Sequence, residues 1–199
     1  MKRILTAAVG ALCLVSICSA CYIREMDTSR NYRYYPAESE TATFEGLISI
    51  NGGMGDKWEF CNNWRIVKAE QSADDLAMPN DAYKRVLDDL KELMKGKTLY
   101  GLTGPENADD YNKHAEDLLD KCPSEYTLWA NFGAWETRKI SENDVYLNNL
   151  RVIVDQTKCY IIVDYRKFGD VDSKRYAYCS EDGELTDGLI KWADKSIES

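Results

Sequence analysis

The chain has 199 residues, a formal net charge of −9, and 44% hydrophobic, 11% aromatic and 30% charged residues. This composition is typical of a globular protein, because a disordered chain has fewer aromatic and β-branched residues and a fibrous chain has more glycine and proline. The length predicts one domain. The acidic balance argues against nucleic acid as a partner, since neutralising phosphates requires clustered lysine and arginine.

The first twenty residues have the pattern of a secretory signal peptide. Lys2 and Arg3 form a short positive region, and residues 4–17 form an apolar stretch. That stretch is shorter than the ~18–20 residues that a membrane-spanning helix needs. We therefore expect residues 1–20 to direct export and to be removed.

The residue after this leader is a cysteine. Cys21 follows the small residues Ser19 and Ala20, and this arrangement resembles the cleavage box of bacterial lipoproteins, in which that cysteine is acylated. The match covers only the processing signal and differs from the usual pattern in having Cys18 three positions before the cleavage point. Because Tyr22 rather than aspartate follows, the resemblance implies an outer-membrane lipoprotein that faces the periplasm or the cell surface. The alternative is a protein secreted freely into the extracellular medium.

The cysteine count agrees with lipidation. The chain has seven cysteines, and five remain once Cys13 and Cys18 leave with the signal peptide. In an oxidising compartment an odd number leaves one thiol without an intramolecular partner. If a lipid occupies Cys21, the other four can form two disulfides; these disulfide candidates are Cys61, Cys122, Cys159 and Cys179. Alternatively, Cys21 pairs and another thiol stays free or links two chains.

The first part of the mature chain predicts a spacer followed by a hairpin. Residues 21–41 are polar and lack any apolar period, which indicates a tether, although their tyrosines could instead pack on the domain. Residues 44–50 alternate like a strand, and residues 58–67 form a second, aromatic-rich strand. The glycine-rich segment 51–56 between them is typical of a turn, so the pair should form a hairpin.

The middle of the chain predicts two amphipathic helices. In residues 80–95 and again in residues 106–121, apolar side chains recur every three or four positions. Gly96 is a plausible stop for the first helix. Each apolar stripe is narrow, so each helix should lie against a sheet with its charged side in water.

The last third of the sequence returns to strands. Four segments have strand character, and a short helix closes the chain; the ranges are residues 126–135, 145–154, 159–165, 175–179 and 185–193. Strands, then helices, then strands predict an α+β fold with a mainly antiparallel sheet, two central amphipathic helices and a short C-terminal helix, stapled by disulfides. Residues 42–199 should form this single α+β domain.

For each motif that resembles a catalytic or ligand site, an interpretation without that function explains the residues better. His114 lies outside the apolar stripe of its helix, without partners at the spacing of a zinc site or a nucleophile system. Residues 52–57 contain three glycines and a lysine, but a hairpin turn explains them better than a phosphate-binding loop. Pairs of aspartates, among them Asp170 with Asp172, are better explained as solvated helix faces and turns, because the segment after Asp170 lacks the glycine of an EF-hand loop; the alternative is a weak calcium site near Asp170. The sequence therefore predicts no catalytic residue, no metal site and no cofactor.

Tryptophans on expected strands are the candidates for a binding face. Aromatic side chains contribute strongly to recognition, although most of them pack in cores. The four candidates are Trp58, Trp64, Trp129 and Trp135.

These observations favour an exported, lipid-anchored, non-enzymatic protein that binds a protein or an envelope component and is held at the membrane through Cys21. One alternative is a freely secreted protein that binds a small ligand between its aromatic strands. A second is a hydrolase whose carboxylates converge in a cleft, which would require acids with perturbed pKa values.

Overall fold

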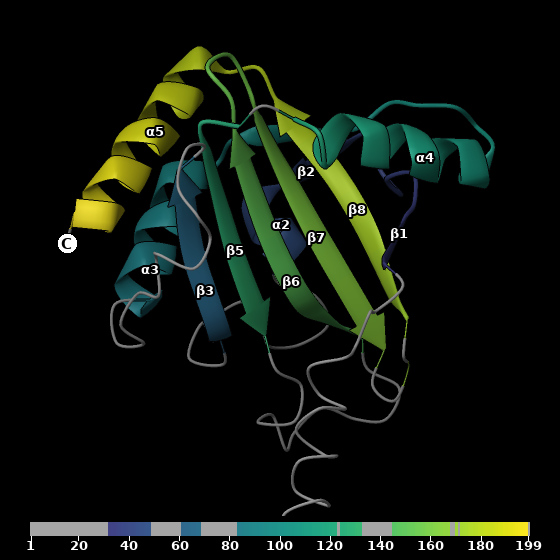
Figure 1. Ribbon diagram of the computed structural model, residues 1–199, viewed down its shortest axis with the longest axis horizontal. Helices are drawn as coiled ribbons and strands as arrows, with labels where there is room; N and C mark the ends of the chain where they lie inside the picture. Colours follow the sequence, from purple (N-terminus) through teal and green to yellow (C-terminus); the bar gives the residue numbers. More distant parts are fainter. Residues whose placement is uncertain are drawn as a thin grey trace, which may run out of the picture. The chain divides into compact units, whose positions relative to one another are not determined.

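The computed structural model describes residues 32–48, 61–68, 83–122, 124–132, 145–167, 170 and 172–198. These residues contain eight strands and four helices (Figure 1). In chain order the elements are β1 (Tyr32–Tyr34), β2 (Thr41–Thr43), α2 (Phe44–Ile48), β3 (Cys61–Lys68), α3 (Tyr83–Met94), β4 (Thr98–Gly101), α4 (Ala108–Leu119), β5 (Tyr126–Phe132), β6 (Val145–Val154), β7 (Cys159–Lys167), β8 (Ser173–Ser180) and α5 (Gly183–Glu198).

All eight strands belong to one sheet with the order β2-β4-β8-β7-β6-β5-β3. Every neighbouring pair in this order is antiparallel. The short strand β1 adds to the edge of β8 in parallel, next to the stretch of β8 that pairs with β4. The predicted α+β class with a mainly antiparallel sheet is therefore confirmed.

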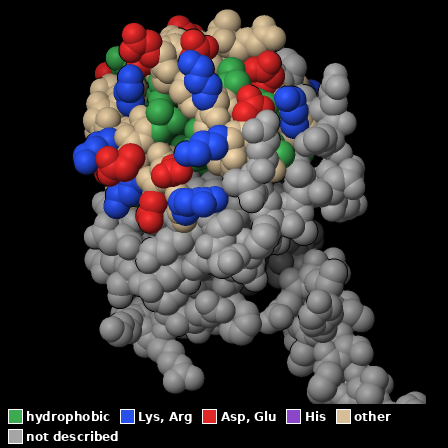
Figure 2. Space-filling model, turned by 90° about the vertical axis from the view of Figure 1, so that its left-hand side faces the viewer, with side chains coloured by type: hydrophobic (Ala, Val, Ile, Leu, Met, Phe, Trp, Pro, Cys, Tyr) green, Lys and Arg blue, Asp and Glu red, His purple; other side chains and the backbone are tan. Residues whose placement is uncertain are grey.

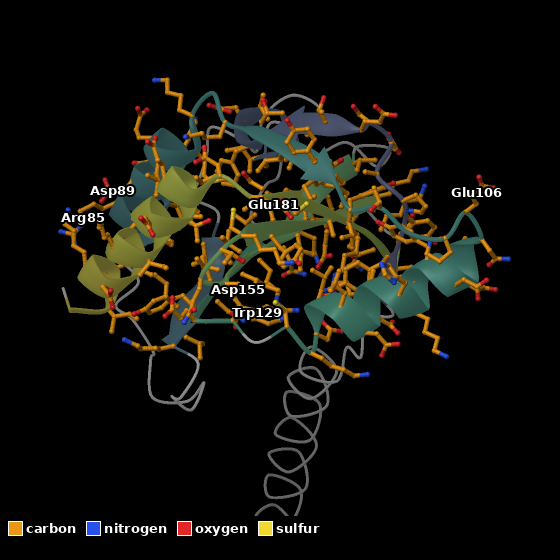
Figure 3. The ribbon with its side chains drawn as sticks, turned by 90° about the horizontal axis from the view of Figure 1, so that it is seen from above. Arg85, Asp89, Glu106, Trp129, Asp155 and Glu181 are labelled. Carbon is orange, nitrogen blue, oxygen red and sulfur yellow. The ribbon has the colours of Figure 1, made fainter. Side chains whose placement is uncertain are left out.

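Helices cover both faces of this sheet. On one face, α2, α3 and α5 bury residues such as Phe44, Leu90 and Leu189 against the sheet. On the other face, α4 buries Tyr111, Ala115 and Leu119 against β6, β7 and β8, and Figures 1 and 3 show α4 lying alone on that side among the described helices. Acidic and basic side chains alternate over the outer surface of α3 and α5 (Figure 2). Both central helices are thus amphipathic and lie against the sheet, as their narrow apolar stripes predict.

Glycine and asparagine mark the ends of the two central helices. Gly96 has φ 69° just beyond α3, a left-handed conformation that favours glycine at a helix stop. Asn107 caps α4, because its side-chain oxygen accepts hydrogen bonds from the backbone N–H groups of Asp109 and Asp110. The stop at Gly96 agrees with the sequence prediction.

The predicted N-terminal hairpin is wrong. Phe44, Leu47 and Ile48 lie in the helix α2, where their spacing of three and four positions brings all three into the core. The strand expected at 58–67 is observed as β3, but it pairs with β5, far along the chain. An alternating apolar pattern over so few residues did not distinguish a short helix from a strand. The pairing partner of β3 depends on tertiary packing, which the local pattern does not show.

Two boundaries also differ from the prediction. The tether expected over residues 21–41 contains β1, and β2 begins at its last residue, so both of these strands belong to the sheet. The C-terminal helix is longer than expected and spans 16 residues. Among the described residues, no helix is both long and apolar enough to cross a bilayer.

Candidate functional site

A row of polar side chains crosses the α4-covered face of the sheet. Asn149 of β6 lies opposite Asp164 of β7, and Asp164 lies opposite Arg175 of β8. We call Asn149, Asp164 and Arg175 the polar row. Its position is unusual because β7 is buried at every residue from Cys159 to Asp164, and charged groups are buried at such positions only when they are paired.

Asp164 and Arg175 form a bidentate ion pair. The distance from Nε of Arg175 to Oδ1 of Asp164 is 2.6 Å, and the second guanidinium nitrogen lies 3.0 Å from Oδ2. The side chains are 13% exposed for Arg175 and 2% for Asp164, and Nδ2 of Asn149 donates to Oδ2 of Asp164 at 3.1 Å. Burial lowers the pKa of the Arg175 guanidinium, but the hydrogen bonds and charge of Asp164 outweigh it and raise the pKa overall. The charges of Arg175 and Asp164 therefore cancel, and both carboxylate oxygens of Asp164 accept hydrogen bonds.

Two tyrosines of β1 close over this ion pair. The guanidinium carbon of Arg175 lies 4.3 Å from the ring centroid of Tyr32 and 5.1 Å from that of Tyr34, within the range of cation–π attraction. Nδ2 of Asn149 also donates to the hydroxyl of Tyr32 at 2.9 Å. Burial, opposed in part by the charge of Arg175, raises the pKa of Tyr34 to about 12. No local sequence pattern predicts this cluster, because its members lie on four different strands and β1 is more than 110 residues away from the other three.

A second group on the same face surrounds Trp129. Trp129 of β5 lies opposite Arg151 of β6, and the guanidinium carbon of Arg151 is 4.4 Å from the indole centroid. The same guanidinium donates to Oδ1 of Asp120, just beyond α4, at 2.9 Å. Trp129 is half-buried, on the α4 side of the sheet (Figure 3). The ring is therefore fixed from one side by a cation that is itself held by a carboxylate.

Only one of the four tryptophans proposed for a binding face can be assessed. Trp129 is partly exposed, as that prediction requires. Trp58, Trp135 and the side chain of Trp64 lie outside the described part of the structure.

The predicted disulfide staples are not found among the described residues. Cys122, Cys159 and Cys179 carry free thiols. Cys159 packs in the core beneath α3 and α5, whereas Cys122 and Cys179 pack on the α4 side, so the sheet separates Cys159 from the other two. Cys21 and the side chain of Cys61 lie outside the described residues. The count of cysteines thus did not reveal which thiols face each other, because adjacent positions of paired strands can point to opposite faces.

The other candidate groups stay on the surface. His114 is exposed on α4, as its place outside the apolar stripe predicts, and Asp170 and Asp172 are exposed. No cluster of three or more potential metal ligands occurs in the residues that the structure describes; the turn at 52–57 lies outside them. Among the described carboxyl groups, Asp117 and Asp182 have shifted pKa values: hydrogen bonds from Lys121 and Lys97 lower them respectively. These directions are opposite to the raised pKa that a general acid needs.

Comparisons with known proteins found no matching family model, no similar curated protein and no similar solved structure.

Breaking the buried ion pair should destabilise the domain. Asp164→Asn leaves the charge of Arg175 buried without a counterion, so we expect the free energy of unfolding to fall by about 3 kcal/mol. Urea unfolding followed by circular dichroism measures this. The double variant Asp164→Leu with Arg175→Met removes both charges and should lose much less. Equal stability of Asp164→Asn and the unmodified protein would show that the pair does not hold the sheet face.

Cys159 should be the least reactive of the described thiols. Burial raises its pKa to about 12, so at pH 8 the thiolate that attacks a disulfide reagent is scarce and shielded. We expect Cys159 to resist Ellman's reagent at pH 8 until the protein unfolds. Because the folded pKa lies above that of the unfolded thiol, its contribution to stability is complete below pH 9 and is lost as the pH rises towards 12. Peptide mapping after labelling identifies the site, and rapid labelling of Cys159 in the folded protein would contradict its burial.

Proposed function

We propose that this protein is exported, anchored by a lipid on Cys21, and binds a protein or another component of the cell envelope. The observation that carries this proposal is the cysteine that directly follows the apolar leader. Acylation of one chain gives only weak membrane binding, whereas the multiple acyl chains of a processed lipoprotein hold a protein firmly. The proposal does not depend on disulfides, since the free thiols of Cys122, Cys159 and Cys179 remove the support that cysteine parity gave it.

Binding is assigned to the surface around Trp129. A partly exposed indole held by a fixed cation offers a large contact area that loses little side-chain entropy when a partner binds, and such residues often dominate binding energy. Arg151 already satisfies part of its hydrogen bonding through Asp120 and the carbonyl of Leu119, so it orients the ring rather than serving as a free charge. This arrangement supports recognition of a partner surface through the α4 side of the sheet.

The anchor is tested by the intact mass of the mature protein from its native host. We expect the mass of residues 21–199 plus acyl groups, and recovery in the membrane fraction. Cys21→Ser should lack the acyl mass and leave that fraction. A mature protein of unmodified mass would overturn the anchor and favour the freely secreted, ligand-binding alternative.

The binding surface is tested by Trp129→Ala. An anchor residue of this type contributes about 2 kcal/mol, so the variant should bind a partner roughly 30-fold more weakly. The readout is the amount of partner recovered with the protein after cross-linking in intact cells. Tyr100→Ala serves as a matched control, because Tyr100 is 55% exposed on β4, which β8, β7 and β6 separate from β5 in the sheet. Equal recovery with both variants would show that Trp129 is not part of the interface.

A further inference from the structure

One aromatic side chain of the sheet stands out in solvent. Tyr100 of β4 is 55% exposed, and it is the only large hydrophobic side chain among the described residues that is exposed. Its neighbour Leu99 is buried in the core beneath α3 and α5. Alternation along the strand therefore places Tyr100 on the α4 side of the sheet, where Cys179 of β8 lies opposite it. A large ring exposed on a buried scaffold is an informative feature of a protein surface.

Three threonines surround Tyr100 on the same face. Thr41 of the edge strand β2 lies directly opposite Tyr100, and Thr43 lies opposite Thr98, two positions before Tyr100. All three threonines are exposed. Neighbouring side chains on one face of paired strands are about 5–7 Å apart, so Tyr100, Thr41, Thr43 and Thr98 form one small block, here named the Tyr100 platform. It presents one aromatic ring and three aliphatic hydroxyl groups, and none of its side chains is charged.

The sheet holds this platform in place. Strand β4 pairs with β2 on one edge and with β8 on the other. Beyond Tyr100, the backbone N–H of Gly101 donates to the carbonyl of Glu40 at 2.9 Å, and that of Leu102 donates to the carbonyl of Ala177 at 2.9 Å. The backbone on both sides of the ring is thus fixed before any ligand arrives, which reduces the entropy lost on binding.

The chemistry of the platform separates the classes of ligand. A stable protein interface buries about 800 Å² on each partner around an apolar centre, whereas the platform has one ring and no second exposed large hydrophobic among the described residues. Anionic lipids and nucleic acids bind clustered lysine and arginine, which the platform lacks. A neutral sugar ring has an apolar face of C–H groups and a rim of hydroxyls. These features match an aromatic ring that is bordered by groups able both to donate and to accept hydrogen bonds.

We propose that the Tyr100 platform binds a neutral glycan, with the C–H face of one hexose ring stacked on Tyr100 and its hydroxyls hydrogen-bonded to Thr41 and Thr98. Sugars with equatorial ring substituents, such as β-linked glucose and N-acetylglucosamine, expose the flattest C–H faces and fit this surface best. The site does not depend on the proposed anchor. It is also separate from the Trp129 surface, because β8, β7 and β6 lie between β4 and β5.

Saturation-transfer difference NMR on the full-length mature protein, purified without a sugar-based detergent, tests this site. The probes are cellohexaose and the hexamer of N-acetylglucosamine. Sorbitol is the control compound, because it carries hydroxyls but has no ring face. We expect millimolar binding of at least one hexamer, with the strongest saturation at the protons of one ring face, and no saturation of sorbitol. Absence of saturation in both hexamers overturns the inference.

Four variants identify the groups that carry the binding. Tyr100→Ala should weaken binding of the hexamer roughly tenfold, because it removes the aromatic contact, whereas Tyr100→Phe keeps the ring and should bind almost as tightly as the unmodified protein. Thr41→Val removes one hydroxyl with little change of shape and should weaken binding several-fold. Thr157→Val is the matched control, because Thr157 is exposed in the turn between β6 and β7, and it should bind normally. Urea unfolding checks that each variant keeps the fold.

The Tyr100→Ala variant also distinguishes a glycan site from a protein interface. We expect it to lose glycan binding while recovery of a partner at the Trp129 surface stays unchanged. Unchanged glycan binding in Tyr100→Ala overturns the inference. If that result came with a fall in partner recovery, the platform would belong to a protein interface instead.

Discussion

The bidentate pair between Arg175 and Asp164 is the constraint on which the α4 side of the molecule depends. It joins β7 to β8 in the middle of the sheet, at a depth where neither charge is stable alone. Asn149 links the pair to β6, and the rings of Tyr32 and Tyr34 join it to β1. One ion pair therefore fixes the relative positions of four strands.

The arrangement of helices explains why a charge can be buried there. The strands β6, β7 and β8 are covered on both faces, by α3 and α5 on one side and by α4 on the other, so most of their residues are apolar. Towards the end of the sheet at which β6 and β8 begin, the helix α4 gives way to β1, whose tyrosines supply both an apolar cover and a π face. A guanidinium suits this boundary, because it can bind a carboxylate in its plane and stack on rings above it.

These features shape the proposed function. The half-buried indole of Trp129 beside Arg151 supports the binding surface that we propose. Strand β1 lies on the same side of the sheet, but its contacts are with Asn112, Asn149 and Arg175, so they do not involve Trp129.

The sequence alone determined the elements whose hydrophobic pattern extends over many consecutive residues. The helices α3 and α4 follow from apolar periodicity over three turns, and the β6–β7 hairpin follows from two strands around a short polar turn. The leader and Cys21 are likewise read directly from consecutive residues, and the export that they predict stays a prediction.

Only the tertiary structure decided the features that depend on residues far apart in the chain. Residues 44–48 became a helix because Phe44, Leu47 and Ile48 could all reach the core in that form. The tyrosines at 32 and 34 left the expected tether because Arg175, more than 140 positions later, offered them a partner. Cys159 does not pair with Cys122 or Cys179, because the sheet directs it to one face and the other two thiols to the opposite face. Local patterns carry no information about which distant side chains share a face, and strand order and register supply it.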